Sequence, residues 1–378
     1  MSNIPVMKPW IGQAEADAAS EAVLSGWVAQ GPRVAEFERQ FAESVGASYA
    51  VATSSCTTAL HLGLVVAGVG PGDEVVVPSL SFIATTNAVR YVGATPVFAD
   101  VELETANLSA ATVAPVLTER TRAVIVVHQG GMPADVGGIK ALVADRDVLV
   151  FEDSACAAGS QLDGLPVGHS SDLAAWSFHP RKLLTTGEGG MITTENPDWA
   201  ASLRRLREHG MSVSAAERHA AGSRVVLESY LEVGFNYRMT DIQAAVGIVQ
   251  LGKLPEMVAR RREIVSAYRT ALKGVPGLIP VPERDSAQSN YQSFWLLLDQ
   301  GWPMSRNELL QFLADRGIQA RRGIMATHME PAYAEFADLD LPATRAITED
   351  SVILPVFHTM TDDEIDQVVA ALEEASTR

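Results

Sequence analysis

A lysine and an aspartate, each placed after an apolar run, are the residues whose types and spacing predict chemistry. Lys182 follows the apolar residues 173–176 and precedes the glycine-rich residues 185–190. Asp153 comes just after a second apolar run, residues 148–151. A lysine amine can form a Schiff base with the aldehyde of pyridoxal phosphate (PLP). An aspartate can pair with the ring nitrogen and keep the ring able to accept electrons. Together they predict a PLP site, although each alone is more typical of a surface lysine or a helix cap.

The elements that must position these side chains alternate between strands and helices. We expect strands near residues 50–53, 74–77, 96–98, 123–127, 148–151, 173–178 and 191–193. We expect helices near residues 14–24, 34–45, 59–67, 82–92 and 139–144. Such alternation is typical of a mostly parallel sheet covered on both faces, which binds ligands at the carboxyl ends of its strands. The polar residues expected at those ends are Thr53, His128, Asp153 and Ser177.

The pattern changes after residue 240. Residues 242–272 predict a long helix, interrupted around Gly252 and Pro255, and its basic run 260–262 is more typical of a solvated helix face than of an anion site. A strand at 294–298 and helices at 306–316 and 362–375 then predict a smaller α+β domain. We therefore expect a large domain over residues 14–250 and a small C-terminal domain over 251–378, joined by residues 1–13.

Composition restricts the classes of function. The chain has 378 residues, 47% of them hydrophobic, and a net charge of −17. This charge argues against unspecific binding to nucleic acid or anionic membranes, which requires basic surface. No apolar stretch predicts a membrane span or a secretory signal. The two cysteines, Cys56 and Cys156, lack metal-ligand spacing and suit a reducing compartment, so we expect a cytoplasmic protein without a metal site.

Three segments together resemble the DegT/DnrJ/StrS family of PLP-dependent sugar aminotransferases. They are residues 152–155, 177–190 and 234–239, and the similarity extends over nearly the whole chain. The resemblance implies the fold-type-I architecture of aspartate aminotransferase, with a mostly parallel sheet in an α/β large domain and a smaller α+β C-terminal domain.

The resemblance also implies roles for individual residues. Lys182 would bond the cofactor and carry the proton, and Asp153 would be the partner of the ring nitrogen. Phe82 would stack on the ring, and His128 would line the pocket. The phosphate would be held by Thr57, Thr58 and Ser177. Asn236 would reach the phosphate of the neighbouring subunit, so that a homodimer is needed for a complete site.

The chain departs from the family pattern in two places. The family commonly has glutamine or histidine at the position of Cys156, contacting the ring hydroxyl, whereas a thiol is a weak hydrogen-bond partner. Near the C-terminus, a segment over the sugar is altered, and there His328 is a candidate substrate contact. Arg321 and Arg322, with Arg33, are the candidates for binding a diphosphate.

The implied reaction moves an amino group from glutamate or glutamine to a keto sugar, most simply a nucleotide-linked keto-deoxysugar. A keto-cyclitol as acceptor, or a non-catalytic PLP-binding partner or regulatory protein, remain alternatives. PLP-dependent sugar dehydratases of this group carry histidine at the position of Lys182, which counts against that chemistry. Lys182 must be neutral to act as nucleophile and base, so its pKa is expected to fall from roughly 10.4.

Overall fold

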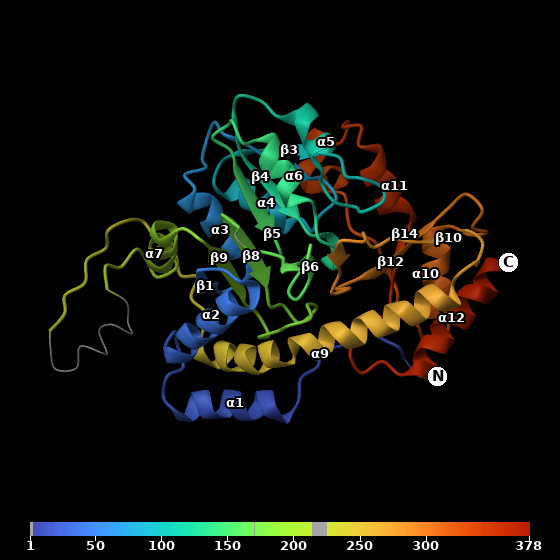
Figure 1. The fold of residues 1–378 in the computed structure, drawn as a ribbon, viewed down its shortest axis with the longest axis horizontal. Helices are drawn as coiled ribbons and strands as arrows, with labels where there is room; N and C mark the ends of the chain where they lie inside the picture. Colours follow the sequence, from blue (N-terminus) through green and yellow to red (C-terminus); the bar gives the residue numbers. More distant parts are fainter. Residues whose placement is uncertain (1–2, 170, 214–224) are drawn as a thin grey trace.

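A seven-stranded sheet forms the centre of the computed structural model, which describes residues 3–169, 171–213 and 225–378 (Figure 1). Its strands are β1 (Tyr49–Thr53), β2 (Glu74–Pro78), β3 (Thr95–Ala99), β4 (Thr121–Val127), β5 (Leu149–Asp153), β8 (Leu173–Ser177) and β9 (Gly190–Thr194). They lie in the order β1-β9-β8-β5-β4-β2-β3. Only β9 runs antiparallel to its neighbours β1 and β8. The expectation of an α/β fold with a mostly parallel sheet is therefore confirmed.

Helices cover both faces of this sheet because its strands are apolar on both sides. Val75 and Val77 of β2 pack in one core cluster, whereas Val76 packs in another, as the two-residue period of a strand requires. The first face is covered by α3 (Cys56–Val66), α4 (Ala84–Tyr91) and α7 (Pro197–Leu206). The opposite face is covered by α2 (Pro32–Val45), α5 (Ala110–Val113), α6 (Val136–Leu142) and α9 (Asp241–Ala271).

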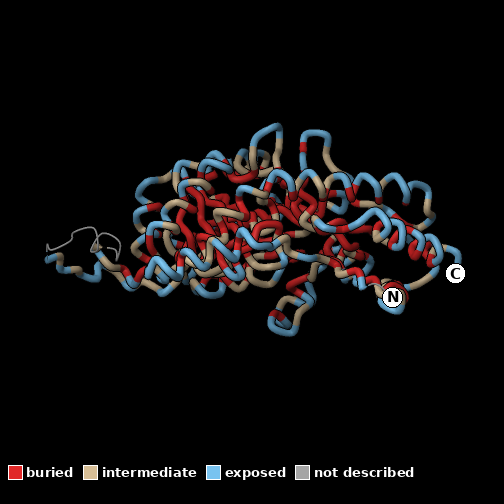
Figure 2. Tube along the Cα trace, turned by 90° about the horizontal axis from the view of Figure 1, so that it is seen from below, coloured by how far each residue is buried: buried red, intermediate tan, exposed pale blue. Residues whose placement is uncertain are grey.

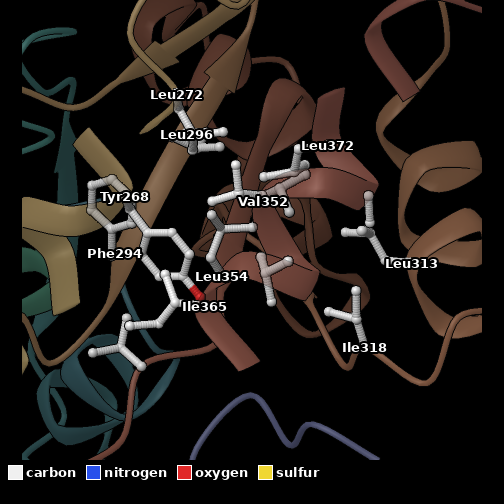
Figure 3. Close-up of a cluster of buried hydrophobic side chains, with 14 of the residues drawn as sticks. Tyr268, Leu272, Phe294, Leu296, Leu313, Ile318, Val352, Leu354, Ile365 and Leu372 are labelled. Atoms are coloured by element: carbon white, nitrogen blue, oxygen red, sulfur yellow. The ribbon is translucent and has the colours of Figure 1, made fainter. Parts of the chain in front are cut away.

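A second, four-stranded sheet lies beside the first. Its order is β10-β12-β14-β13, formed by β10 (Leu278–Pro280), β12 (Phe294–Leu298), β14 (Ser351–Leu354) and β13 (Arg321–Arg322). Three helices lie beside this sheet, namely α10 (Arg306–Ala314), α11 (Pro342–Asp350) and α12 (Asp362–Ser376). Tyr268, Leu296, Leu313, Val352 and Leu372 belong to its buried core (Figure 3).

Short elements complete the described chain. A three-stranded sheet has the order β11-β6-β7, from β11 (Ala287–Gln288), β6 (Gln161–Leu162) and β7 (Leu165–Pro166). The 3₁₀ turns are Ala114–Val116, Gln129–Gly131, Thr327–Met329 and Pro331–Phe336. The helix α1 (Gln13–Leu24) lies along α9 (Figure 1). None of the helices in the described part of the chain is long and apolar enough to cross a membrane.

The helix α9 connects the two cores without a break, so the expected interruption around Gly252 and Pro255 is wrong. Leu251 and Leu254 pack in the core beside the large sheet, whereas Ile264 and Tyr268 pack in the core of the second sheet. Anchoring on both sides of Pro255 offsets the loss of its backbone donor and keeps the helix continuous. The expected boundary at residue 250 falls inside this helix, and the division into domains stays a prediction.

The N-terminal segment adds to the second core. Ile4 is fully buried there, and its backbone pairs with Gly317 and Gln319. Figure 2 shows that buried residues run through the body of the molecule, beneath an exposed surface.

Candidate active site

A cavity of about 840 Å³ lies between the carboxyl ends of the large-sheet strands and the second sheet. The residues lining it include eight of those predicted from the sequence: Thr57, Phe82, Asp153, Cys156, Ser177, Lys182, Arg321 and Arg322. The cavity therefore brings together side chains separated by more than 250 positions in the chain.

Lys182 is held by a tight turn after β8. Its backbone N–H donates to the carbonyl of His179 at 2.8 Å, and its Nζ lies 3.0 Å from Cys156 Sγ. Burial lowers the pKa of Lys182, but its neighbours Cys156, Cys56 and Asp153 outweigh burial and raise the pKa above its ordinary value. The protein alone therefore favours the protonated amine, contrary to the expected fall.

Asp153 ends β5 and is fixed by two donors. Thr85 Oγ1 donates to Asp153 Oδ2 at 2.7 Å, and the backbone N–H of Ala155 donates to Oδ1 at 3.2 Å. The hydroxyls of Ser81 and Thr85 lie 2.8 Å apart. Because the Thr85 proton points to the carboxylate, Ser81 is the donor of this second bond. The hydroxyls of Ser81 and Thr85 thus form a hydrogen-bonded chain that orients the Asp153 carboxylate.

The N-terminus of α3 forms another wall. Ser55 caps the helix by accepting from the backbone N–H of Thr58 at 3.2 Å, and the Thr58 hydroxyl donates back to the Ser55 carbonyl at 2.8 Å. Thr58 is thus a capping residue that does not line the cavity, unlike Ser55, Cys56 and Thr57. The cap leaves the first backbone N–H groups of the helix for an anion.

A glycine of β9 lets this helix start approach the sheet. A Cβ on Gly190 would lie 2.4 Å from the Ser55 carbonyl group and 2.6 Å from Cys56 N. Any larger residue would push the α3 N-terminus away from Ser177, which pairs with Gly190 across β8 and β9.

These groups suit the chemistry of PLP. An amine, a carboxylate and a helix N-terminus with the hydroxyls of Thr57 and Ser177 all face one cavity. They match the aldehyde, the ring nitrogen and the phosphate of the cofactor, respectively.

Four other predicted residues lie outside the cavity lining, namely His128, Arg33, Asn236 and His328. His128 is buried, accepts from Ala134 N at Nδ1 (3.0 Å) and so carries its proton on Nε2, 3.0 Å from Glu152. The expectation that His128 lines the pocket is not met in this structure, because its ring is buried and pairs with Glu152. Arg33 and Asn236 are also absent from the lining of this single chain.

His328 does not face substrate either. Its side chain is completely buried, and Nδ1 lies 2.6 Å from the Ser79 hydroxyl. Its loop is tied to the end of β2 by the backbone bond from Thr327 to Ser79. The expected substrate contact at His328 is therefore wrong in this structure.

The basic run 260–262 is not a solvated helix face at its central residue. Arg261 is 3% exposed, and burial lowers its pKa to about 9. Its guanidinium donates to two backbone carbonyls instead of facing solvent.

Several residues of the site carry little or no signal in the sequence. Thr85 has a weak signal, since it is a polar residue near the start of a helix that follows a strand. Gln292 and Arg181 line the cavity as well. Gln292 carries no local signal, because it is far from Lys182 in sequence.

Comparisons with known proteins agree with this geometry. The model of the DegT/DnrJ/EryC1/StrS aminotransferase family matches residues 9–373. The spore coat polysaccharide biosynthesis protein SpsC of Bacillus subtilis is 36% identical, with 98% of this chain and 96% of that protein covered. The GDP-perosamine synthase of Caulobacter vibrioides is 38% identical, with 99% of each chain covered.

Solved structures share the fold. The aminotransferase TlmJ from Streptoalloteichus hindustanus is 37% identical and superposes with a TM-score of 0.91, covering 98% of both chains. The protein Spr1654 of Streptococcus pneumoniae, solved in a PLP form, is 28% identical with a TM-score of 0.91, covering 99% of both chains. The fold is that of PLP-dependent aminotransferases, and PLP is the cofactor. The chain belongs to the DegT/DnrJ/EryC1/StrS aminotransferase family.

Proposed function

We propose that this sugar aminotransferase moves an amino group from glutamate or glutamine to a nucleotide-linked keto sugar in the cytoplasm. The observation that carries the proposal is the single cavity lined by Lys182, Asp153 and the N-terminus of α3, with arginines at its rim.

Lys182 is the residue that bonds the cofactor and moves the proton. When bound, PLP supplies an aldehyde that captures an amine and a ring that accepts the electron pair. With the cofactor bound, the Lys182 amine would take the proton from Cα of the amino donor and would deliver it to the cofactor. This role requires a neutral amine, so proton release from Lys182 limits the reaction at low pH.

Asp153 and the α3 N-terminus hold the cofactor at its two ends. The Asp153 carboxylate keeps the ring nitrogen protonated, and Thr85 keeps that carboxylate in place. Thr57 and Ser177 would hold the phosphate together with the first backbone N–H groups of α3, and Phe82 would pack against the ring. These assignments use residues that line one cavity.

The rim of the cavity supports an anionic acceptor. Burial, and after it the positive charge of Arg181, lowers the pKa of Arg321, and both arginines line the cavity. Neither makes an ion pair with a residue that the structure describes. Arg322 adds a third guanidinium, 3.5 Å from Glu330. Because the protein as a whole is strongly acidic, this local positive charge favours a diphosphate, as in the nucleotide-linked sugar that the name GDP-perosamine synthase implies for that relative.

An exposed apolar segment supports a homodimer. Val225, Leu227 and Val233 are 85%, 86% and 91% exposed, and residues 225–233 project from the body of the molecule (Figure 1). Side chains of this kind in one segment are typical of a protein interface. We propose that the partner subunit covers the segment and that Asn236, which follows it, reaches the partner's phosphate site.

The visible absorption spectrum tests the reaction. Protein loaded with PLP should show a near-visible band that bleaches with glutamate or glutamine and returns with the correct keto sugar. Lys182→Ala should lack both the band and steady-state turnover. A band that neither donor changes would contradict the proposed donors, and measurable turnover by Lys182→Ala would contradict the role of Lys182.

Titration with nucleoside diphosphates tests the acceptor class. We expect binding that weakens by about tenfold or more in Arg321→Ala, because a charge-assisted contact is lost. No affinity for any nucleoside diphosphate would favour the keto-cyclitol alternative.

A further inference from the structure

A strained segment between β11 and β12 contacts both loops that carry the reactive side chains. Its central residue, Tyr291, has φ +46°, a left-handed conformation that non-glycine residues rarely adopt. Such strain persists only where surrounding contacts enforce it, and it is concentrated at functional sites. The side chains of Asn290 and Gln292, on either side of Tyr291, make those contacts.

Gln292 bridges the two peptide groups that flank Lys182. Its Oε1 accepts from the backbone N–H of Leu183 at 3.1 Å, and its Nε2 donates to the carbonyl of Arg181 at 2.6 Å. One amide side chain therefore fixes the backbone immediately before and after the lysine. Gln292 also lines the cavity that Lys182 enters.

Asn290 performs the same task on the loop after β5. Its Nδ2 donates to the carbonyls of Cys156 and Ala158, each at 2.8 Å. Its Oδ1 accepts from the backbone N–H of Gln292 at 2.8 Å. The side chains of the two loops meet where Lys182 Nζ approaches Cys156 Sγ at 3.0 Å.

The segment is anchored on α9 by the buried Arg261. The guanidinium donates from Nε to the Tyr291 carbonyl at 2.8 Å and from Nη2 to the Gln292 carbonyl at 3.0 Å. The Tyr291 hydroxyl donates to Glu283 at 2.8 Å. The segment of Asn290, Tyr291 and Gln292 is therefore fixed to α9 through Arg261. It contacts the Lys182 loop through the Gln292 side chain.

We infer that Gln292 is a positioning residue that holds the backbone of Lys182 in the geometry for bonding the cofactor. The inference rests on the proposed role of Lys182. A lysine side chain has four rotatable bonds, so the position of its amine depends on a fixed backbone. Misplacement of a reacting group by about 1 Å can cost up to ~100-fold in rate. Gln292 therefore acts on the attachment step rather than on cofactor affinity.

The test compares attachment of PLP with binding of pyridoxamine phosphate, which cannot bond to lysine. Gln292→Met keeps the length and volume of the side chain but removes both hydrogen bonds. In the cofactor-free protein, we expect the near-visible band to appear at least ~tenfold more slowly after PLP is added. Affinity for pyridoxamine phosphate should stay within about twofold, because the cavity keeps its shape.

Two further variants complete the design. Gln292→Glu keeps the acceptor for Leu183 but sets a carboxylate against the Arg181 carbonyl, so it should also slow attachment and carries the test if the methionine variant does not fold. Gln311→Met, on the exposed face of α10, is the matched control and should attach PLP at the wild-type rate.

The outcomes separate the inference from the proposed function. Attachment at the wild-type rate in Gln292→Met overturns the inference, and so does an equal loss of attachment rate and pyridoxamine phosphate affinity, which would indicate general damage to the cavity. A normal band in Lys182→Ala would instead overturn the role proposed for Lys182.

Discussion

The sulfur of Cys156 lies 3.0 Å from the amine that the proposed reaction uses. The family resemblance predicts a glutamine or histidine at this position, and a thiol is a weaker hydrogen-bond partner. Here the thiol contacts Lys182 instead, and together with Cys56 and Asp153 it outweighs burial and raises the pKa of the lysine. Cys156 therefore affects how easily the amine loses its proton.

We expect Cys156→Ala to shift the pH dependence of PLP attachment. A raised pKa keeps Lys182 protonated, so attachment to the cofactor-free protein should speed up as pH rises. Removing the sulfur lowers the pKa of Lys182, and the rise should then occur at lower pH. The rate of band formation across pH measures this. An unchanged profile, or a shift to higher pH, would exclude Cys156 as the cause.

Two adjacent threonines provide a matched test of the support for Asp153. Thr85 donates to the carboxylate, whereas Thr86 has a buried hydroxyl without a partner among the described residues. Thr85→Val should lower kcat by roughly tenfold, because a hydrogen bond to a charged group is worth about 1.5–3 kcal/mol. Thr86→Val should keep its activity. Equal activity of the two variants would exclude the hydroxyl chain as a support.

Residues at strand ends could be predicted from sequence, but side-chain directions could not. Lys182, Asp153 and Ser177 are predictable because each follows an apolar run that indicates a strand, and ligands bind at the carboxyl ends of such strands. His128 stands at such an end too, yet it turns into the interior to pair with Glu152. Gln292 reaches the lysine from over a hundred residues away, which no local pattern reveals.

At the scale of elements, most helices and strands follow the apolar periodicity of the sequence, and α9 is the informative exception. Its glycine and proline predicted an interruption, because each lowers helix propensity. Packing against two cores overrides that preference. Local propensity decides an element only where tertiary contacts are weak.

The start of α9 also stabilises the start of α2. The N-cap of α2 is Gly31, which has no side chain to cap with, and the buried Asp241 accepts instead from the backbone N–H groups of Gly31, Arg33 and Val34. Asp241→Ala should lower the free energy of unfolding by about 3 kcal/mol, because three donors lose a charged acceptor. Denaturant unfolding measures this.

The exposed Asp366 on α12 provides the control for that measurement. Asp366→Ala should change stability by less than about 0.5 kcal/mol. A similar decrease in the free energy of unfolding in both variants would show that the Asp241 capping contact does not stabilise the protein more than an exposed aspartate does.

At the scale of the whole molecule, we propose that a second copy of the chain completes the site. The sequence predicts this only through the family resemblance, and a single chain shows only the exposed apolar residues 225–233 before Asn236. Burial of these apolar side chains in the proposed symmetric dimer would explain why they are exposed in a single chain.

Mixed dimers test the shared site. Lys182→Ala and Asn236→Ala subunits should each be inactive or nearly so when alone. A dimer that combines them has one site with both native residues, so random mixing should restore about a quarter of wild-type activity. Refolding the two variants together and assaying turnover measures this. Activity no higher than that of the separate variants would contradict a site shared through Asn236.

The most direct measurement locates the bond between protein and cofactor. Borohydride reduction of the PLP-loaded protein makes that bond permanent, and mass spectrometry of the digested protein then identifies the modified residue. We predict that the cofactor is found on Lys182 and that prior treatment with glutamate or glutamine removes the label. A label on another lysine, or none on any peptide, would contradict the site described for this protein.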